Sequence, residues 1–457
     1  MDQVISSLKA SQSQALDELF EFLRIPSVSA DSQFKPAMQQ CADFVLKAMQ
    51  AAGLTAEIIT TKGHPIVYGE RIEDASLPTV LIYGHYDVQP PDPLDLWTTP
   101  PFEPQIRDGK VFARGATDDK GQVFTHLKSL QACIDVNGKL PVNVKFLIEG
   151  EEEVGSDNLD KFLEQSKDRL KADIAVISDT SQYGDGIPAI TYGLRGIVAA
   201  EVRLTGPSKD LHSGVYGGSI ANPANAIAAL CGSLVDATGR VQIPGFYDDV
   251  AELTEAEKQQ FEALPFSESE FLNEIGSGAV FGEDGYSTLE RRWTRPTCDI
   301  NGIVSGYTGE GPKTIVPSKA SAKITCRMVP NQNPEKILDS LETFLRDQCP
   351  AGLKFEFLRF HGCEGFVLDP TSPWISAASE AVEAAFGKSP VFIREGGSIP
   401  VVSSFQQILG IDTLLLGWGR NTDNLHSPDE HFHVEDFHNG TLASAYLWEK
   451  LGAVKAS

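Results

Sequence analysis

Three short apolar segments that each run into acidic residues constrain the fold of this chain more than any other feature. Each has the composition and length of a buried strand: Thr79–Tyr83, Val142–Ile148 and Asp173–Ser178. Helical patterns lie between them, and this alternation is typical of doubly wound α/β proteins. Such folds bind ligands in the crevice outside the carboxyl ends of their parallel strands. The sequence therefore predicts a ligand site at one edge of an α/β sheet.

The length of 457 residues indicates two domains, because a single core rarely grows beyond about 250–300 residues. After the first α/β segment, the expected order of elements changes to β-α-β-β-α-β, the ferredoxin-like arrangement. Alternating strands and helices then return. We predict a doubly wound α/β domain with a mixed sheet, formed by residues 1–192 and 363–457, and an inserted ferredoxin-like α+β domain at residues 193–362. Residues 236–296 show mixed helix and loop patterns, and these patterns do not indicate a function for the segment.

The formal net charge of -25 argues against a partner such as nucleic acid or an anionic membrane, which both require a basic surface. No apolar run is long enough to span a bilayer, and the N-terminal residues lack the basic and apolar regions of an export signal. Seven scattered cysteines without zinc-finger spacing indicate free thiols in a reducing compartment. We therefore expect a soluble cytoplasmic protein, some of whose many carboxylates bind cations.

His85 and Asp87 follow the first of the three predicted strands. Side chains two residues apart on a strand point to the same side. In metal sites, the histidine nitrogen that does not bind the metal usually donates a hydrogen bond to a carboxylate, which fixes the tautomer of the ring. The pattern predicts that His85 binds a metal and that Asp87 orients its ring. A histidine at a strand end is weak evidence alone, so the prediction depends on the residues downstream.

Further acidic residues and a histidine fall at predicted strand ends or in the loops beyond them: Asp118, Glu152, Glu153, Asp179 and His426. Carboxylates with two imidazoles suit zinc, manganese or cobalt better than calcium, which prefers oxygen alone, or structural zinc, which prefers thiolates. Two ions would need a bridging carboxylate and a separation of about 3.5–4 Å. An acidic run such as Glu151–Glu153 is usually a solvated loop, but here a predicted buried strand leads directly into it.

Five segments resemble the dinuclear zinc exopeptidases, a family that includes carnosine dipeptidases, aminoacylases and carboxypeptidase G. They are His85–Asp87, Gly115–Gly121, Glu149–Ser156, Ser178–Asp179 and His426–Ser427. The resemblance extends over essentially the whole chain and is strongest to the cytosolic non-specific dipeptidase branch. It implies a zinc-exopeptidase-like catalytic domain with an inserted lid and dimerisation domain.

The resemblance also implies two divalent ions per subunit, with zinc as the expected metal and manganese or cobalt as alternatives. One ion would be held by His85, Asp118 and Asp179, and the other by Asp118, Glu153 and His426, so that Asp118 is the bridge. Glu152 matches the general base that takes a proton from the attacking water. The peptide bond between Asp118 and Asp119 is expected to be cis.

A second set of matches lies mainly in the predicted inserted domain. His212, within Asp210–Gly218, matches the histidine that stabilises the tetrahedral oxyanion, and the dipeptidase branch implies that a two-fold partner donates it. Four residues match the side of the site that holds the substrate carboxylate: Arg327, Thr314, His361 and Ser398. A guanidinium suits this task because it pairs with a carboxylate in bidentate fashion. Arg327 would otherwise be an ordinary surface arginine on a strand.

Other histidines have more ordinary interpretations. His431 and His433, close to His426, resemble a metal-binding pair by themselves, but the family uses only His426. His64 and His126 are expected to be surface or packing residues.

We therefore predict a metal-dependent hydrolase that cleaves the amide bond of dipeptides or short peptides with a free C-terminal carboxylate. An N-acyl-amino-acid deacylase uses the same machinery and is the alternative within enzymes. A non-catalytic binding protein on this fold is the alternative from another class, and the complete ligand set with an intact Glu152 counts against it. The sequence predicts a homodimer but not the side-chain preference of the substrate.

Overall fold

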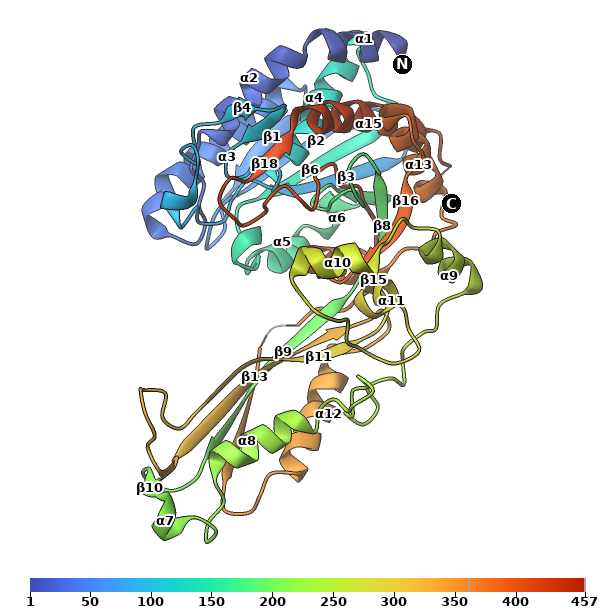
Figure 1. The fold of residues 1–457 in the computed structure, drawn as a ribbon. Coiled ribbons are helices and arrows are strands. Elements are labelled where there is room, and N and C mark those ends of the chain that lie inside the picture. The colour runs from blue at the N-terminus through green and yellow to red at the C-terminus, as the bar shows by residue number, and fades with distance from the viewer. Residues whose placement is uncertain (361, 456–457) are drawn as a thin grey trace. The chain divides into compact units, whose positions relative to one another are not determined.

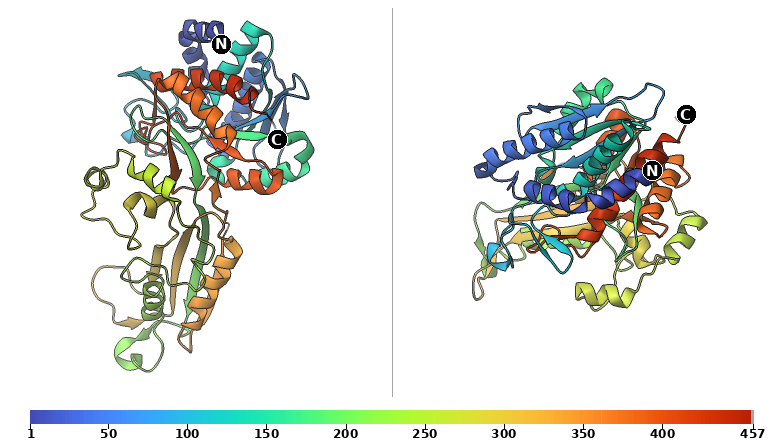
Figure 2. Two further views of the ribbon diagram at one scale, coloured as in Figure 1. Left: turned by 90° about the vertical axis from the view of Figure 1, so that its right-hand side faces the viewer. Right: turned by 90° about the horizontal axis from the view of Figure 1, so that it is seen from above.

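The computed structural model describes residues 1–360 and 362–455, which form two compact units (Figures 1 and 2). The first unit comprises Met1–Tyr192, Leu368–Ile393 and Ser404–Ser457, and the second comprises Gly193–Val367 and Arg394–Ser403. The sequence-based division, with an inserted domain at residues 193–362, stays a prediction about folding domains. The compact units differ from it because residues 363–367 and Arg394–Ser403 are part of the second unit.

A large mixed sheet organises the first unit, with strand order β1-β2-β6-β3-β7-β17-β8-β15 and β16 also paired to β8. Its strands are β1 (Thr55–Ile59), β2 (Ile66–Arg71), β3 (Thr79–His85), β6 (Asn143–Glu149), β7 (Ile174–Ile177), β8 (Ala189–Leu194), β15 (Phe366–Val367), β16 (Val391–Glu395) and β17 (Thr413–Leu415). The central four strands, β6, β3, β7 and β17, are parallel, and β1, β2 and β8 join them in antiparallel pairs. The predicted mixed α/β sheet is confirmed.

The parallel register brings the carboxyl ends of β3, β6 and β7 to one edge of the sheet. His85 lies opposite Glu149 at the end of β6, and Tyr83 lies opposite Ile177 at the end of β7. All residues of β6 and β7 are buried, as expected for strands covered on both faces. The acidic residues that follow these strands therefore begin from neighbouring positions.

Helices cover both faces of this sheet. On one face, α3 (Lys35–Ala51), α4 (Lys120–Asn137), α13 (Pro373–Phe386) and α15 (Val434–Gly452) pack together and on the strands (Figure 1). A Cβ on Gly84 of β3 would lie 2.7 Å from Cγ2 of Val123 in α4, so the backbones approach closely there. The ring of the preceding Tyr83 packs edge-on against Phe405, with centroids 5.6 Å apart, on the opposite face. That face is covered by α5 (Leu159–Gln165) and the π-helical segment η4 (Phe405–Leu409).

The N-terminal residues up to Leu23 form two helices. These are α1 (Asp2–Ala10) and α2 (Gln12–Leu23), which are separated at Ser11. The Ser11 hydroxyl donates to the Ser7 carbonyl at 3.0 Å, a local bond that competes with continuous helix. Within the described residues, no helix is both long and apolar enough to cross a membrane.

A four-stranded antiparallel sheet, in the order β11-β13-β9-β14, forms the core of the second unit. Its strands are β9 (Gly196–Thr205), β11 (Thr297–Ser305), β13 (Lys319–Met328) and β14 (Lys354–Arg359). Helices α8 (Pro223–Gly232) and α12 (Pro334–Asp347) pack on it. Both begin with Asn-Pro, where the asparagine side chain accepts a helix N–H and proline occupies the first turn. The predicted β-α-β-β-α-β arrangement is confirmed.

Smaller elements complete each unit. In the first unit, β4 (Gln105–Arg107), β5 (Lys110–Phe112) and β18 (His431–His433) form a three-stranded sheet, and α6 (Lys167–Leu170) is a short helix. In the second, β10 (Leu211–His212) pairs with β12 (Ile315–Val316) and leads into α7 (Ser213–Tyr216). The segment 236–296 contains α9 (Glu255–Glu262), α10 (Glu268–Ile275) and α11 (Thr288–Trp293). The short helix α14 (Pro400–Ser404) lies where the chain returns to the first unit.

Candidate metal centre

His85 is the last residue of β3 and is fully buried at the edge where the parallel strands end. Its Nε2 atom lies 3.1 Å from Oδ1 of Asp118 and 3.8 Å from Oδ2 of Asp179. The structure places ligand atoms of His85, Glu152 and Asp179 within 4.8 Å of one another. Within the described chain, Nε2 of His85 has no hydrogen-bond partner. An orphaned nitrogen facing carboxylates fits a bound cation.

A second group of ligand atoms lies beside the first. Asp118, Glu153 and His426 also offer atoms that all lie within 4.8 Å of one another. Nε2 of His426 is 2.9 Å from Oδ2 of Asp118 and 3.4 Å from Oε2 of Glu153. Asp118 thus presents one carboxylate oxygen to His85 and the other to His426. This is the arrangement that a bridging carboxylate between two metal ions requires.

The ring of His85 is oriented by Asp87, although mainly through the backbone. Nδ1 of His85 donates to the Asp87 carbonyl at 3.0 Å, whereas the Asp87 carboxylate oxygen Oδ1 is 3.4 Å away. The sequence argument expected the carboxylate, but β3 ends at His85, so strand alternation does not extend to Asp87. The other oxygen of Asp87 accepts the backbone N–H of Glu153 at 3.1 Å. Asp87 therefore fixes the tautomer of one candidate ligand and positions the next.

Glu430 holds the segment that carries Asp118. Its carboxylate accepts the backbone N–H groups of Gly115, Thr117 and Asp118 at 2.9 to 3.2 Å, and Nη1 of Arg114 at 2.7 Å. Arg114 and Glu430 are both almost completely buried. Sequence reasoning missed this residue, and its only signal was its position four residues after His426. These hydrogen bonds fix the position of Asp118 between His85 and His426.

The backbone is unusual at two of these positions. The Asp118–Asp119 peptide bond is cis, as the resemblance implied. Oδ2 of Asp119 accepts the backbone N–H of His85 at 3.2 Å. His426 has a φ of 58°, in the left-handed region that costs energy for a residue with a side chain. Left-handed backbone at such a residue is concentrated at functional sites.

Glu152 and Glu153 lie in a short 3-10 turn, η3 (Glu152–Val154), just after β6. Oε2 of Glu153 accepts a hydrogen bond from the Gln89 amide at 2.8 Å. By contrast, the Glu152 carboxylate takes part in no hydrogen bond found among the described residues. Glu153 is thus held in place, whereas Glu152 is left available for proton transfer.

The cluster gathers more negative than positive charge. Burial, and then the neighbouring carboxylates, raise the pKa of Glu152 to about 7, although His85 opposes this shift. Burial and the Asp118 charge raise the pKa of Glu153 to about 8. Burial acts to raise the pKa of Asp118, but the adjacent rings of His426 and His85 hold that pKa below its usual value. Buried carboxylates this close need compensating cations, so the donor set fits bound metal.

The remaining predicted site residues belong to the second unit. His212 is exposed on β10, and the Thr314 carbonyl beside it accepts the backbone N–H of Ser213 at 3.0 Å. Nη1 of Arg327, on β13, donates to the Ser398 hydroxyl at 2.9 Å. His361 lies outside the described residues. The structure therefore brings Arg327 and Ser398 into contact within this unit.

The fold and the site define a class of protein: an α/β metalloenzyme with two adjacent metal-binding groups of carboxylates and imidazoles at the carboxyl ends of parallel strands. Such donors suit zinc, manganese or cobalt. Residues 81–450 match the model of Peptidase family M20/M25/M40. The chain belongs to this peptidase family.

Individual relatives are similar over most or all of their length. The Cys-Gly metallodipeptidase dug1 of Schizosaccharomyces pombe is 34% identical over 466 residues, covering 98% of both chains. The human Beta-Ala-His dipeptidase is 34% identical over 399 residues, covering 84% of this chain and 77% of the human one. Among solved structures, the M20 family metallo-carboxypeptidase Sso-CP2 from Sulfolobus solfataricus has a TM-score of 0.86 and 34% identity, covering 96% and 99% of the two chains.

Proposed function

We propose that this chain hydrolyses the amide bond of dipeptides or short peptides that carry a free C-terminal carboxylate. The observation that carries the proposal is the position of Asp118 between His85 and His426, with Glu152 beside them. The similar proteins named as metallodipeptidases support the substrate class. An N-acyl-amino-acid deacylase remains the alternative, because the same groups would serve it.

Five residues are proposed to hold two divalent ions: His85, Asp118, Glu153, Asp179 and His426. When bound, such ions supply Lewis acidity, which lowers the pKa of water and polarises a carbonyl group. We propose zinc, with manganese and cobalt as alternatives, because nitrogen and carboxylate donors without thiolates suit these metals. The chain is proposed to work in the cytoplasm.

Glu152 is proposed as the general base. Its carboxylate lies within 4.8 Å of ligand atoms of His85 and Asp179, and hydrogen bonds do not hold it elsewhere in the described chain. The carboxylate takes a proton from the attacking water and then gives it to the nitrogen of the leaving amine. Proximity alone would also allow Glu152 to be a metal ligand, so experiment must separate the two roles.

His212 is proposed to stabilise the oxyanion of the tetrahedral intermediate. Its Nδ1 atom accepts the backbone N–H of Gly214 at 3.0 Å. Because Nδ1 is the acceptor, the neutral ring carries its proton on Nε2, which is the form that donates a hydrogen bond. The local structure thus supports the role that the family resemblance suggests.

Arg327 and Ser398 are proposed to bind the substrate carboxylate, together with Thr314 and His361. Arg195 lies near Arg327: burial, and then the charge of Arg327, lower the pKa of Arg195 to about 10, although Asp299 opposes this shift. A cluster of guanidinium groups whose charges destabilise one another favours an incoming anion. This environment supports a carboxylate-binding role within the second unit.

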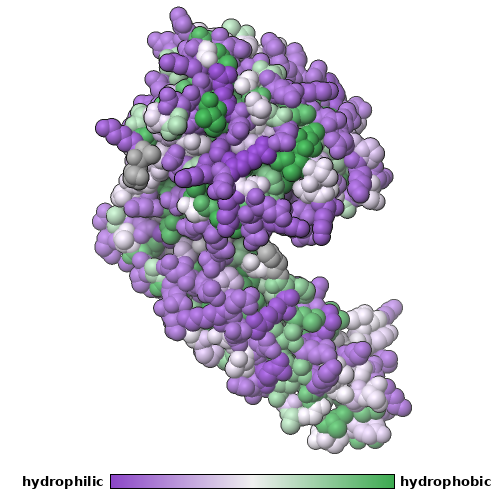
Figure 3. All heavy atoms as spheres, turned by 180° about the vertical axis from the view of Figure 1, so that it is seen from behind, coloured by the Kyte–Doolittle hydropathy of each residue, from purple (hydrophilic) through white to green (hydrophobic). Residues whose placement is uncertain are grey.

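A two-fold homodimer is proposed, in which the partner supplies His212. The edge strand β11 carries the exposed side chains of Ile303 and Val304. Val215 and Tyr216 are also exposed in α7, next to His212, and Figure 3 shows hydrophobic side chains among polar ones at the end of the second unit that carries α7. Exposed apolar side chains on a sheet edge and beside a functional histidine support self-association.

Subunit mixing tests whether His212 acts in trans. Glu152→Ala and His212→Ala homodimers should both be nearly inactive. After random exchange, about half of the dimers are mixed, and one of their two sites combines an intact Glu152 with an intact partner His212, so activity should recover to roughly a quarter of the wild-type rate. Exchange shown by differently tagged subunits, without any recovery, would exclude donation in trans. A fully active His212→Ala variant would remove the residue from catalysis.

A substrate screen tests the function itself. Metal-stripped protein is supplied with zinc, manganese or cobalt and offered dipeptides, tripeptides, C-terminally amidated dipeptides and N-acyl amino acids. The proposal predicts the highest kcat/KM for dipeptides with a free carboxylate. A clear preference for N-acyl amino acids would instead establish the deacylase, and no hydrolysis of any amide with any of the three metals would contradict both.

A further inference from the structure

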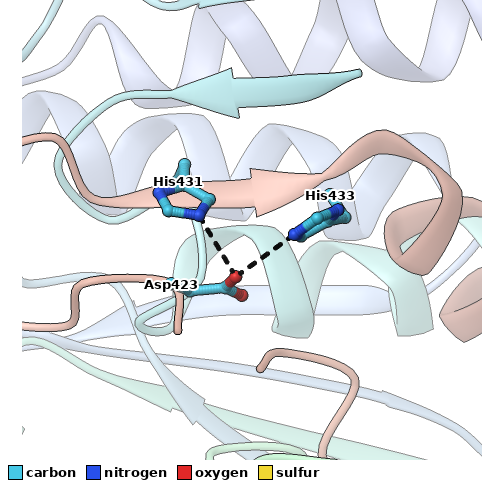
Figure 4. Close-up of side chains that lie close together, drawn as sticks. All are labelled: Asp423, His431 and His433. Carbon is cyan, nitrogen blue, oxygen red and sulfur yellow. Dashed lines mark ion pairs between the residues drawn. The ribbon is translucent and has the colours of Figure 1, made fainter. Parts of the chain in front are cut away.

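A third group of metal-binding side chains lies outside the two groups of the proposed dinuclear centre. His431 and His433 are two residues apart on β18 and therefore point to the same side of the strand. Their Nε2 atoms lie 3.6 Å and 3.8 Å from the same oxygen, Oδ1 of Asp423. Figure 4 shows both rings turned toward this carboxylate. The three residues share no member with the other two groups.

Two of the three facing atoms, Nε2 of His431 and Oδ1 of Asp423, present lone pairs to one another. Nδ1 of His431 donates to the Asp429 carbonyl at 2.9 Å, which places the lone pair of the neutral ring on Nε2. Oδ2 of Asp423 accepts the Thr117 hydroxyl at 3.1 Å and the Arg420 backbone N–H at 2.9 Å. Oδ1 has no hydrogen-bond partner within the described chain, although Asp423 is fully buried. Acceptor atoms that face one another in this way are stabilised by a cation bound between them.

We propose that Asp423, His431 and His433 form a third metal site, which binds zinc or a similar transition-metal ion. Two imidazoles and one carboxylate are a common set of three protein ligands, and they leave further positions for water. Bonds of about 2.0–2.1 Å to a tetrahedral ion place ligand atoms about 3.3 Å apart. The observed 3.6 Å and 3.8 Å separations need to close by only a few tenths of an ångström. Calcium and magnesium are disfavoured because they prefer oxygen ligands.

Lys110 competes with a metal for one of the ligands. Its Nζ atom lies 3.2 Å from Nε2 of His431 and occupies the same lone pair. Lys110 is only partly buried, so its flexible stem can move the ammonium group into solvent. His433 also lines a surface hollow of about 510 Å³, together with His438, which gives an ion a route to the site. The site thus borders the surface hollow at His433, and we expect Lys110 to weaken its metal binding.

Counting bound ions tests the proposal. Wild-type protein is dialysed against a series of buffered free-zinc concentrations up to the millimolar range, and zinc per chain is measured by elemental analysis. We expect three ions per chain for wild type, two for His433→Ala, and three for the matched control His438→Ala. Lys110→Met should take up the third ion at about tenfold lower free zinc, because the competing ammonium is gone.

Crystals soaked in zinc provide a measurement that needs no variant. Anomalous scattering should show a peak between Asp423, His431 and His433 in addition to those of the dinuclear centre. The proposal is overturned if wild type stops at two ions and shows no such peak. It is equally overturned if the third ion persists in both His433→Ala and His431→Gln. Loss of folding in a variant leaves the diffraction result to decide.

Discussion

Exchanging Glu152 for glutamine should remove most of the catalytic rate while both metal ions remain bound. Glu152 is half-buried beside His85 and Asp179, and the described chain offers its carboxylate no hydrogen bond. Glutamine keeps the shape of the side chain but cannot accept the proton of the attacking water. The adjacent Glu153 differs, because Gln89 donates to it at 2.8 Å and His426 lies 3.4 Å away.

The size of the effect follows from the role. General acid–base catalysis contributes about 10²–10⁴-fold to a rate. The Glu152→Gln variant should therefore lose this factor in kcat, equivalent to about 2.7–5.4 kcal/mol of transition-state stabilisation. Metal content should stay at the wild-type level. The matched Glu153→Gln variant should instead bind one ion more weakly and recover activity when metal is added.

The assay combines steady-state kinetics on a dipeptide with elemental analysis of the same dialysed samples. Both variants are measured at several concentrations of added zinc. The reasoning would be refuted if Glu152→Gln lost an ion and Glu153→Gln kept both, because the roles of the two residues would then be exchanged. Wild-type kcat in Glu152→Gln would remove the proposed base altogether.

Three further predictions concern other parts of the chain. Arg327→Lys should lower kcat/KM about tenfold or more for free dipeptides, because an ammonium lacks the planar fork; equal losses on amidated dipeptides would contradict this. Glu430→Gln should lower the free energy of unfolding, measured in urea, by about 3–5 kcal/mol, because it leaves Arg114 buried without its counter-charge. The control Glu380→Gln removes an exposed ion pair with Lys450 and should change this free energy by less than about 1 kcal/mol. Burial lowers the pKa of His126 to about 3, so that as the pH falls below 7 the unfolded chain takes up this proton before the folded chain does. The free energy of unfolding should therefore fall by about 2 kcal/mol between pH 7 and pH 5. The His126→Gln variant should not show this part of the pH dependence.

Much of the fold could be predicted because local patterns coincide with it. Helix α13 (Pro373–Phe386) buries apolar residues at helical spacing, and β13 (Lys319–Met328) alternates between buried and more exposed residues. The expected sheet-edge site also follows from local signals, since the predicted buried strands lead directly into His85 and Glu149. In contrast, β1 (Thr55–Ile59) is exposed or half-buried throughout and shows no clear alternation.

Contacts between distant residues were not predictable. Arg114 pairs with Glu430, which lies 316 positions further along the chain, and no local sequence pattern predicts a buried ion pair. Arg394 pairs with Glu257, which lies 137 positions earlier in the segment 236–296. His126, expected at the surface or in packing, is buried between the hydroxyls of Ser178 and Ser444. The contacts and burial of these side chains depend on residues that are distant in the sequence.

The proposed third metal site shows the same limit within one short stretch of the chain. His431 and His433 are visible in the sequence as a pair, but the family resemblance implies that, among the histidines of this C-terminal segment, only His426 binds a metal. Asp423, which completes the group, precedes the pair by several irregular residues and gives no periodic signal. Only the folded loop brings its carboxylate under both rings.

Reconstitution of metal-free protein tests the central claim most directly. Metal is removed by exhaustive chelation and confirmed absent by elemental analysis, and zinc is then added stepwise while hydrolysis of a free dipeptide and bound zinc are measured together. The account predicts no turnover without metal and maximal turnover once the ions held around Asp118 are in place. Undiminished hydrolysis by protein shown to contain no metal would contradict it.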